Sequence, residues 1–161
     1  MRKKLEIAGL AALAAFAWIT VRALYGPLRL PEKIPLHFDM EGRVDGWGSS
    51  LSLLSLPVVA LALYLLMTVV ARYPGAFNFP VRVTAGNRAR LESIALDMIA
   101  WLKVELVCVF AWIQHMSIEA ARKGQGSISP WFMPAVLVVI FGTILWHFGA
   151  MRKAARPLPA G

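Results

Sequence analysis

The sequence predicts an all-α integral membrane protein: a four-helix transmembrane bundle with a structured extracytoplasmic loop between its first and second helices. Of the 161 residues, 58% are hydrophobic and 16% are charged, whereas about a quarter of the residues of a soluble domain are charged. A soluble protein of this length could not bury so many apolar side chains. They gather in four stretches that each approach the roughly 20 residues of a membrane-spanning helix. This pattern excludes a soluble enzyme, a disordered chain and a disulfide scaffold.

These stretches divide a single membrane domain, residues 1–161, into helices and loops. Helices are expected at residues 5–25, 51–71, 94–115 and 131–150, with an extracytoplasmic motif loop at 26–50 and a cytoplasmic loop at 72–93. The first stretch follows Arg2, Lys3 and Lys4 and could also be a cleaved signal peptide. Its apolar run continues to Tyr25, beyond the core of a usual signal peptide, and this length favours a retained helix.

The other three helices have recognisable beginnings. Ser50 can cap the second helix, and Pro57, about two turns further on, should bend it. Thr84 can start the third helix before the membrane. Ser129 followed by Pro130 is typical of an N-cap with proline at the first helical position, and it predicts the start of the fourth helix.

The distribution of Lys and Arg predicts the orientation of the bundle. Ten of the 17 basic residues lie at the N-terminus, in the 72–93 loop and in the C-terminal tail. Six lie on the other side, five in the other two loops and Arg22 near the end of the first helix. Loops rich in Lys and Arg stay in the cytoplasm, so we expect both termini there, in the plasma membrane of a bacterium. The net charge of +8 therefore indicates membrane orientation, and no nucleic-acid partner is expected.

The extracytoplasmic loop has the composition of a rigid cap. Pro31 and Pro35 favour extended backbone at the residues before them. Gly42 can form the turn between two short strand segments, and Asp45 begins a second turn dipeptide. Trp47 should meet the membrane surface where the second helix begins.

Eleven residues of this loop carry a resemblance to a known family: Leu30, Pro31, Ile34, Pro35, His37, Phe38, Gly42, Asp45, Trp47, Gly48 and Ser49. The segment resembles the membrane family catalogued as domain of unknown function 1648, with Ser50 in place of its usual lysine. The cytoplasmic loop is also similar to short members of that family, and the residues that carry this similarity include Asn78, Pro80, Asn87 and Arg90. The same domain begins the SdpI-type proteins, which confer immunity to a secreted toxin and relay its presence to a repressor. The resemblance therefore implies, by analogy, a role in sensing or immunity.

The acidic side chains near His37 admit three interpretations. Alternation along an extended segment would place His37, Asp39 and Glu41 on one side, where they could bind a cation. The interpretation we favour is that His37 and Asp45 pin the loop by hydrogen bonds to the backbone. A catalytic role is the third, although no catalytic triad, phosphate loop or dinucleotide fingerprint is present, and no cofactor is expected.

The third helix carries ionisable residues inside its apolar stretch. At 100° per residue, one arc contains Asp97, Trp101, Glu105, Cys108, Trp112 and His115. Lys103 lies on a different arc, with Glu92 and Gln114. Such groups are rare in membranes and indicate either a functional site or a structural network.

Two arrangements of these residues remain open. In a structural network, Glu105 would be protonated and bonded to Ser55 or Tyr64, and Asp97 would face His147. In a proton or substrate path, Asp97 and Glu105 would be the carriers, with His115 at the outer mouth.

Two functions follow from these features. The first is a non-enzymatic sensor, immunity or accessory protein that binds a peptide, a toxin or another membrane protein through the extracytoplasmic loop. The alternative is a small transporter or proton-coupled membrane enzyme that uses Asp97 and Glu105. As an assembly subunit, the chain could instead dock another membrane protein on the polar face of the third helix. A homo-oligomer is also possible, and the lipid bilayer is the surrounding partner in every case.

Overall fold

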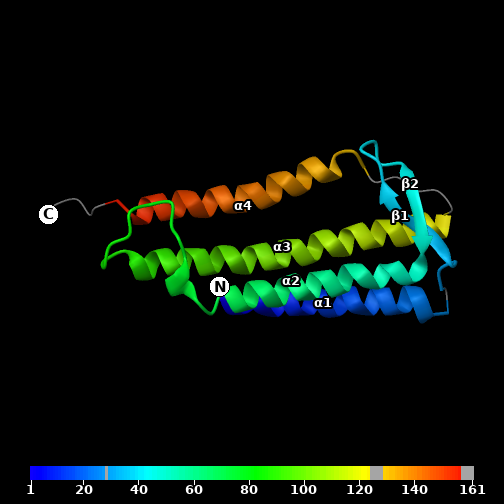
Figure 1. Ribbon diagram of the computed structural model, residues 1–161, viewed down its shortest axis with the longest axis horizontal. Coiled ribbons are helices and arrows are strands. Elements are labelled where there is room, and N and C mark those ends of the chain that lie inside the picture. The colour runs from blue at the N-terminus through cyan, green and yellow to red at the C-terminus, as the bar shows by residue number, and fades with distance from the viewer. Residues whose placement is uncertain (28, 124–128, 157–161) are drawn as a thin grey trace.

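The computed structural model describes residues 1–27, 29–123 and 129–156. These residues form four α-helices, two strands and two short 3-10 helices: α1 (Arg2–Tyr25), β1 (Lys33–Phe38), β2 (Val44–Ser49), η1 (Ser50–Leu54), α2 (Ser55–Val70), η2 (Pro74–Ala76), α3 (Arg88–Lys123) and α4 (Phe132–Ala154). The helices run along the long axis, with the strands at one end and the start of α1 and the end of α4 toward the other (Figure 1).

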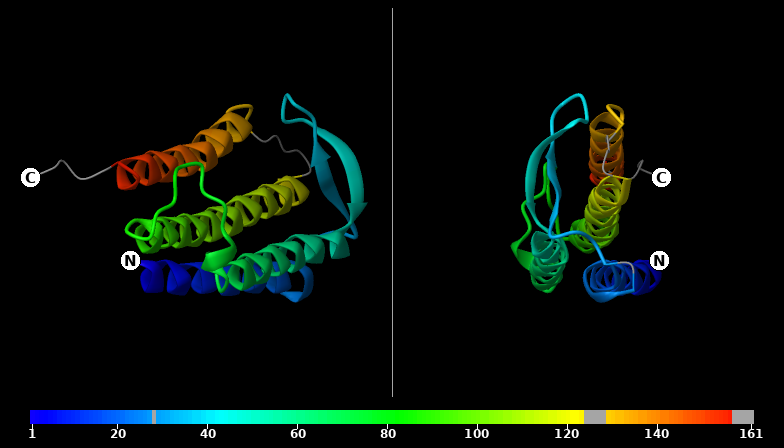
Figure 2. Two further views of the ribbon diagram at one scale, coloured as in Figure 1. Left: turned by 60° about the vertical axis from the view of Figure 1, so that its left-hand side comes forward. Right: turned by 90° about the vertical axis from the view of Figure 1, so that its right-hand side faces the viewer.

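The helix α3 is the centre of the arrangement. It packs against α1, α2 and α4, whereas the main contacts of α4 are with α3. Viewed along the long axis, α4 lies on one side of α3, and α1 and α2 lie on the other (Figure 2). A side chain on α3 can therefore meet partners from every other helix.

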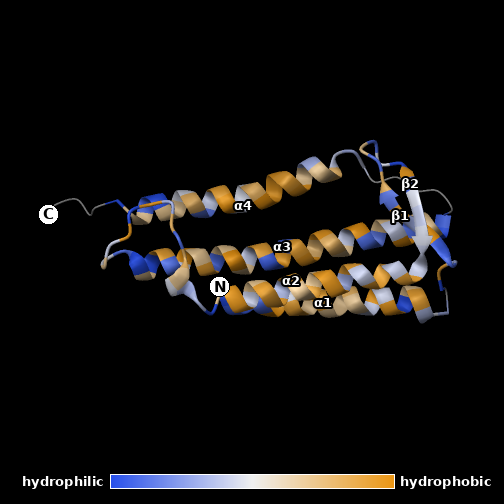
Figure 3. Cartoon of the chain, in the orientation of Figure 1, coloured by the Kyte–Doolittle hydropathy of each residue, from blue (hydrophilic) through white to orange (hydrophobic). Residues whose placement is uncertain are grey.

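Three of the helices are long and apolar enough to cross a membrane: α1, the continuous segment Ser50–Val70, and α4. The helix α3 is not among them, and Asp97, Lys103 and Glu105 lie within its apolar stretch. Figure 3 shows the apolar colouring along all four helices and polar residues at both ends. The expectation of helices that are long and apolar enough to span a membrane is thus confirmed for three elements. The remaining helix, α3, is longer than expected and extends beyond residues 94–115 at both ends.

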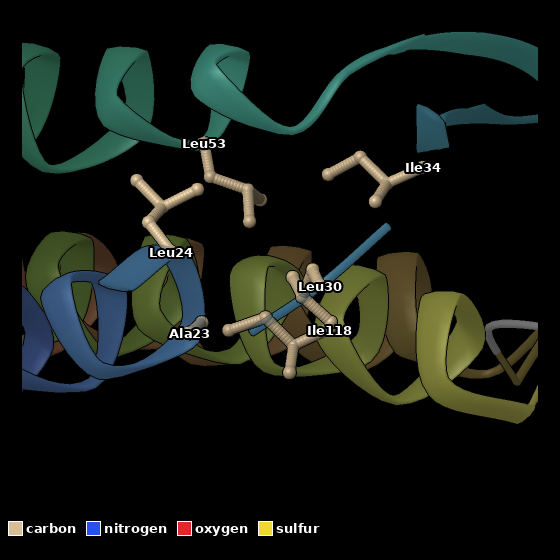
Figure 4. Close-up of a cluster of buried hydrophobic side chains, with 6 residues drawn as sticks. All are labelled: Ala23, Leu24, Leu30, Ile34, Leu53 and Ile118. Carbon is tan, nitrogen blue, oxygen red and sulfur yellow. The ribbon is translucent and has the colours of Figure 1, made fainter. Parts of the chain in front are cut away.

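The strands β1 and β2 form an antiparallel pair, which we call the hairpin. Its turn is closed by Gly42, whose φ of 80° is a backbone conformation that glycine adopts without steric cost. Six buried side chains, the outer cluster, fix the hairpin to the helices: Ala23, Leu24, Leu30, Ile34, Leu53 and Ile118. Figure 4 shows them meeting from α1, the segment before β1, β1 itself, η1 and α3. The loop is therefore an ordered cap, as the prolines and Gly42 predict.

At the opposite end, the loop between α2 and α3 (residues 71–87, the connecting loop) lies against the bundle. Buried side chains of α3 and α4 form an inner cluster: Leu91, Ala95, Met151 and Ala154. Three apolar residues of the connecting loop, Phe77, Phe79 and Val81, pack against it. This contact holds the loop beside the end of α4, as the first view also shows (Figure 1).

Candidate functional site

The hairpin brings His37 and Asp45 together across its two strands. His37 Nδ1 lies 2.5 Å from Asp45 Oδ1, and both side chains are exposed. Gly46 is opposite His37 in the strand register, and a Cβ atom at residue 46 would lie 2.8 Å from the Cβ of His37. Glycine therefore leaves room for the imidazole beside Asp45. We expected these residues to bond to the backbone, and this was wrong, because they bond to each other.

The turn of the hairpin is organised by Asp39. Its carboxylate accepts hydrogen bonds from the Arg43 backbone N–H at 2.8 Å and from Arg43 Nε at 3.0 Å. The backbone hydrogen bond, followed by the guanidinium, holds the pKa of the Asp39 carboxyl below its usual value. Arg43 Nη2 also lies 3.3 Å from Glu41 Oε2. Both carboxylates therefore pair with Arg43 and not with His37.

These pairings argue against a cation site in the loop. Across the described residues, no three His, Cys, Asp or Glu side chains lie close enough to hold a metal ion. His37 and Asp45 alone would give two ligands, fewer than a structural or catalytic zinc ion requires.

The other loop-motif residues divide between buried supports and exposed groups. Pro35 is buried, and Phe38 and Gly48 are half-buried, whereas Pro31 is exposed. Trp47 is 58% exposed, although it lies directly before the apolar segment Ser50–Val70. The hydroxyl of Ser49, rather than Ser50 as expected, accepts the capping bond from the Leu51 backbone N–H at 3.3 Å.

A cavity of 390 Å³ separates the hairpin from the start of α4. One wall is the hairpin, with Leu36, His37 and Met40, and the opposite wall includes Phe132 and Met133. Met40 is 95% exposed at the tip. The hairpin therefore presents an open, largely apolar cavity with one His–Asp pair at its edge.

The second candidate region is a buried polar cluster around Lys103. This side chain is 2% exposed, and its Nζ lies 2.5 Å from Glu6 Oε1 and 2.7 Å from Oε2. Thr68 Oγ1 is 3.1 Å from the same nitrogen, and the Tyr64 ring centroid is 4.4 Å away. The Tyr64 hydroxyl donates to Glu6 Oε2 at 2.7 Å. Four polar side chains thus join α1, α2 and α3 through one ammonium group.

Glu6 is the functional candidate that the sequence analysis missed. It follows three basic residues and therefore looks like part of a solvated helix start. The signal that could have found it is the isolation of Lys103. Lys103 is on a different arc from Asp97 and Glu105, and Glu6 is the only carboxylate in the other three helices. Because a buried ammonium is costly without a counterion, Glu6 was the candidate partner for Lys103 on the neighbouring helices.

Asp97 and Glu105, the two acidic residues inside the apolar stretch of α3, have partners other than those expected. Asp97 accepts from Arg2 Nε at 2.8 Å and does not face His147. Glu105 accepts from the Thr143 hydroxyl at 2.5 Å and does not meet Ser55 or Tyr64. The reason is the angular position of α3: the arc with Glu105 faces α4, while Tyr64 is held by Glu6 on the other side.

Among the described residues, the two histidines of the helices, His115 and His147, make no hydrogen bond to the acidic side chains of α3. His147 Nδ1 lies 2.7 Å from the Thr143 backbone carbonyl, which can only accept, so Nδ1 carries a proton. His115 is exposed, and its ring centroid lies 6.1 Å from that of Trp112. The polar groups of α3 thus form separate clusters, and the hydrogen bonds of the described residues do not join Asp97, Glu105 and His115 into one chain.

In the connecting loop, Asn87 holds the backbone ahead of α3. Its Oδ1 accepts from the Thr84 backbone N–H at 2.8 Å, and its Nδ2 donates to the Arg82 carbonyl at 3.0 Å. Asn78 and Pro80 are exposed on either side of Phe79, which packs on the inner cluster. Arg90 is exposed at the start of α3.

Comparison with known proteins matches one segment of the chain to a family, and the hairpin lies inside that segment. Residues 12–61 match the family Domain of unknown function (DUF1648). The match runs from α1 through the hairpin into α2 and confirms the resemblance that the loop motif carries. It ends before the connecting loop, whose similarity to the family stays a prediction. No curated protein and no solved structure matches the chain.

The Lys103 cluster predicts strong coupling between Glu6 and Lys103. Glu6→Gln leaves a buried ammonium without its counterion and should lower the free energy of unfolding by about 3 kcal/mol. Adding Lys103→Met should restore at least about 1 kcal/mol relative to the sum of the two single changes. The measurement is a double-mutant cycle of unfolding in detergent micelles.

The control for this cycle is Asp97→Asn, which breaks the more exposed pair with Arg2 and should cost less than about 1 kcal/mol. Strictly additive effects of Glu6→Gln and Lys103→Met would contradict a direct interaction between the two side chains.

The Asp39 turn predicts a carboxyl group that titrates below 3.8, its ordinary value. Because the folded pKa is depressed, the carboxylate stabilises the hairpin above that pH, and the stabilisation is lost as the pH falls through the folded pKa. NMR titration of the labelled Asp39 carboxyl carbon measures this value. Arg43→Ala should raise it only partly, since the stronger backbone donor remains. Full return to the ordinary value would show that the guanidinium dominates instead.

Proposed function

We propose that this chain is a multi-pass plasma-membrane protein whose hairpin binds a peptide or protein partner outside the cytoplasm. In this proposal the four helices form the transmembrane bundle, with α3 shielded at its centre and both termini cytoplasmic. The chain performs no catalysis of its own. It acts as a sensor, immunity or accessory protein.

The observation that carries the proposal is the hairpin itself, an ordered structure with apolar side chains that it does not bury. The outer cluster fixes its base, yet Trp47, Met40 and Leu36 remain 58%, 95% and 39% exposed. Exposed aromatic and apolar groups beside a preformed cavity are typical of a binding surface. The family match over this segment adds that the hairpin belongs to the part of the chain shared with other proteins.

The orientation has support from the distribution of charge. The start of α1, the connecting loop and the end of α4 lie at one end of the bundle, and the hairpin lies at the other (Figure 1). The connecting loop and the last turn of α4 carry Arg72, Arg82 and Arg152. Positively charged loops remain on the cytoplasmic side during insertion. The hairpin would then face the outside, where a secreted peptide or toxin reaches it.

A photocrosslinking amino acid at Met40, in the full chain expressed in its own cells, tests the partner. We expect one defined peptide or protein to be crosslinked. Trp47→Ala and His37→Ala should each remove it, because loss of an anchoring side chain costs about 2 kcal/mol or more, roughly thirtyfold in affinity. Tyr25→Ala, which truncates another exposed aromatic residue at the same end, is the matched control.

Two results would sink this proposal. One is a chain that inserts normally but gives no crosslinked product from Met40 and no toxin sensitivity on deletion. The other is a product that persists unchanged in both hairpin variants.

A second function, proton-coupled transport or membrane catalysis, is favoured by one observation at Glu105. Its Oε2 atom is buried and has no hydrogen-bond partner among the described residues. An unpaired carboxylate oxygen in an apolar environment is costly, and such groups mark proton paths in membrane proteins.

Proton flux into liposomes containing the purified protein tests this second function. With a pH-sensitive dye inside the liposomes and an imposed potential, transport through Glu105 predicts that Glu105→Gln abolishes the flux. Glu119→Gln, at the hairpin end of α3, should leave it unchanged. Equal flux in the wild type and Glu105→Gln would rule out a carrier role for this residue.

A further inference from the structure

Three arginines from three different segments line one cavity at the end of the bundle opposite the hairpin. Arg82 comes from the connecting loop, Arg90 from the first turn of α3, and Arg156 from the chain after α4. The cavity has a volume of 550 Å³. Its wall also includes Thr84, whose hydroxyl can donate a hydrogen bond.

The convergence of these arginines is built into the fold. Phe77, Phe79 and Val81 pack on the inner cluster and bring the connecting loop beside the end of α4. Asn87 then ties the loop backbone at Thr84 and Arg82 to the start of α3. Ala154 and Ala155 form the α4 side of the cavity with small side chains. The cavity is thus a hollow between packed elements.

The charge of this cavity is unbalanced. No carboxylate is among its lining residues, and Arg82, Arg90 and Arg156 form no ion pair within the described part of the chain. Two other arginines do have carboxylate partners: Arg88 Nε lies 3.0 Å from Glu92 Oε1, and Arg2 pairs with Asp97. Three guanidinium groups around one space repel each other, and a bound anion would relieve that repulsion.

We propose that this cavity binds a phosphate group. Guanidinium forms paired hydrogen bonds to phosphate oxygens, and three of them can neutralise a charged phosphate from several directions. The amino end of the long helix α3 adds a partial positive charge at the same place. The phosphate comes from the headgroup of an acidic phospholipid or from a soluble phosphate compound.

This site is separate from the proposed partner surface of the hairpin, at the opposite end of the molecule. Binding to purified protein also does not depend on which side of the membrane each end faces. Failure of either proposal therefore leaves the other intact.

The experiment compares two triple variants of the purified full chain. The first, Arg82→Gln with Arg90→Gln and Arg156→Gln, removes the lining arginines. The second, Arg72→Gln with Arg152→Gln and Lys153→Gln, removes the same charge from exposed residues of the same end that do not line the cavity. Native mass spectrometry measures the affinity of each protein for short-chain phosphatidylglycerol, with phosphatidylcholine as the uncharged comparison. Calorimetry measures the binding of inorganic phosphate.

A phosphate site predicts that the first triple variant loses at least tenfold in affinity for phosphatidylglycerol or for inorganic phosphate, while the second loses less than threefold. Binding of the lipid without inorganic phosphate identifies a lipid headgroup as the source, and binding of inorganic phosphate identifies a soluble compound. Replacing the three arginines by lysine should give an intermediate loss, since lysine cannot form paired bonds.

Equal losses in the two triple variants would show a diffuse positive surface and overturn the site. The proposal also fails if the wild-type protein binds neither inorganic phosphate nor phosphatidylglycerol in preference to phosphatidylcholine. Circular dichroism and gel filtration of each variant check that the helices and the oligomeric state are retained.

Discussion

The buried ammonium group of Lys103 is the constraint on which the arrangement of the helices depends. A cation with 2% exposure needs a counterion and hydrogen-bond acceptors, and these come from Glu6 on α1 and Thr68 on α2. Meeting that requirement fixes how far α1 and α2 slide along α3 and which face of α3 they cover. The opposite face is then left for α4, where Thr143 meets Glu105.

The central position of α3 links the two ends of the molecule. Its Ile118 is part of the outer cluster beneath the hairpin, and its Leu91 is part of the inner cluster beneath the connecting loop. Both surfaces with a proposed ligand are therefore attached to one continuous helix, Arg88–Lys123. The hairpin and the arginine-lined cavity lie at opposite ends of this helix.

The length of the apolar runs and the turn residues predict much of this fold. They do not predict how each helix is rotated about its axis, and so they do not predict which side chains meet. The helices α1, α2 and α4 follow from runs of apolar residues, and Gly42 marks the turn of the hairpin. The side-chain pairs did not follow. In one of the two arrangements left open by the sequence Asp97 would face His147, whereas in the structure each bonds elsewhere. Which faces meet depends on the Glu6–Lys103 pair, and Glu6 is hidden in sequence by its basic neighbours.

The position of Glu6 ahead of Lys103 in the chain has a consequence for biosynthesis. Ribosomes make α1 and α2 before α3, so the carboxylate of Glu6 and the hydroxyls of Tyr64 and Thr68 precede Lys103. In a chain inserted into a membrane as proposed, the Glu6 carboxylate is already present when α3 brings the Lys103 ammonium into the bundle. The least apolar of the four helices therefore has no need to partition into lipid alone, and the order of synthesis becomes part of how the bundle assembles.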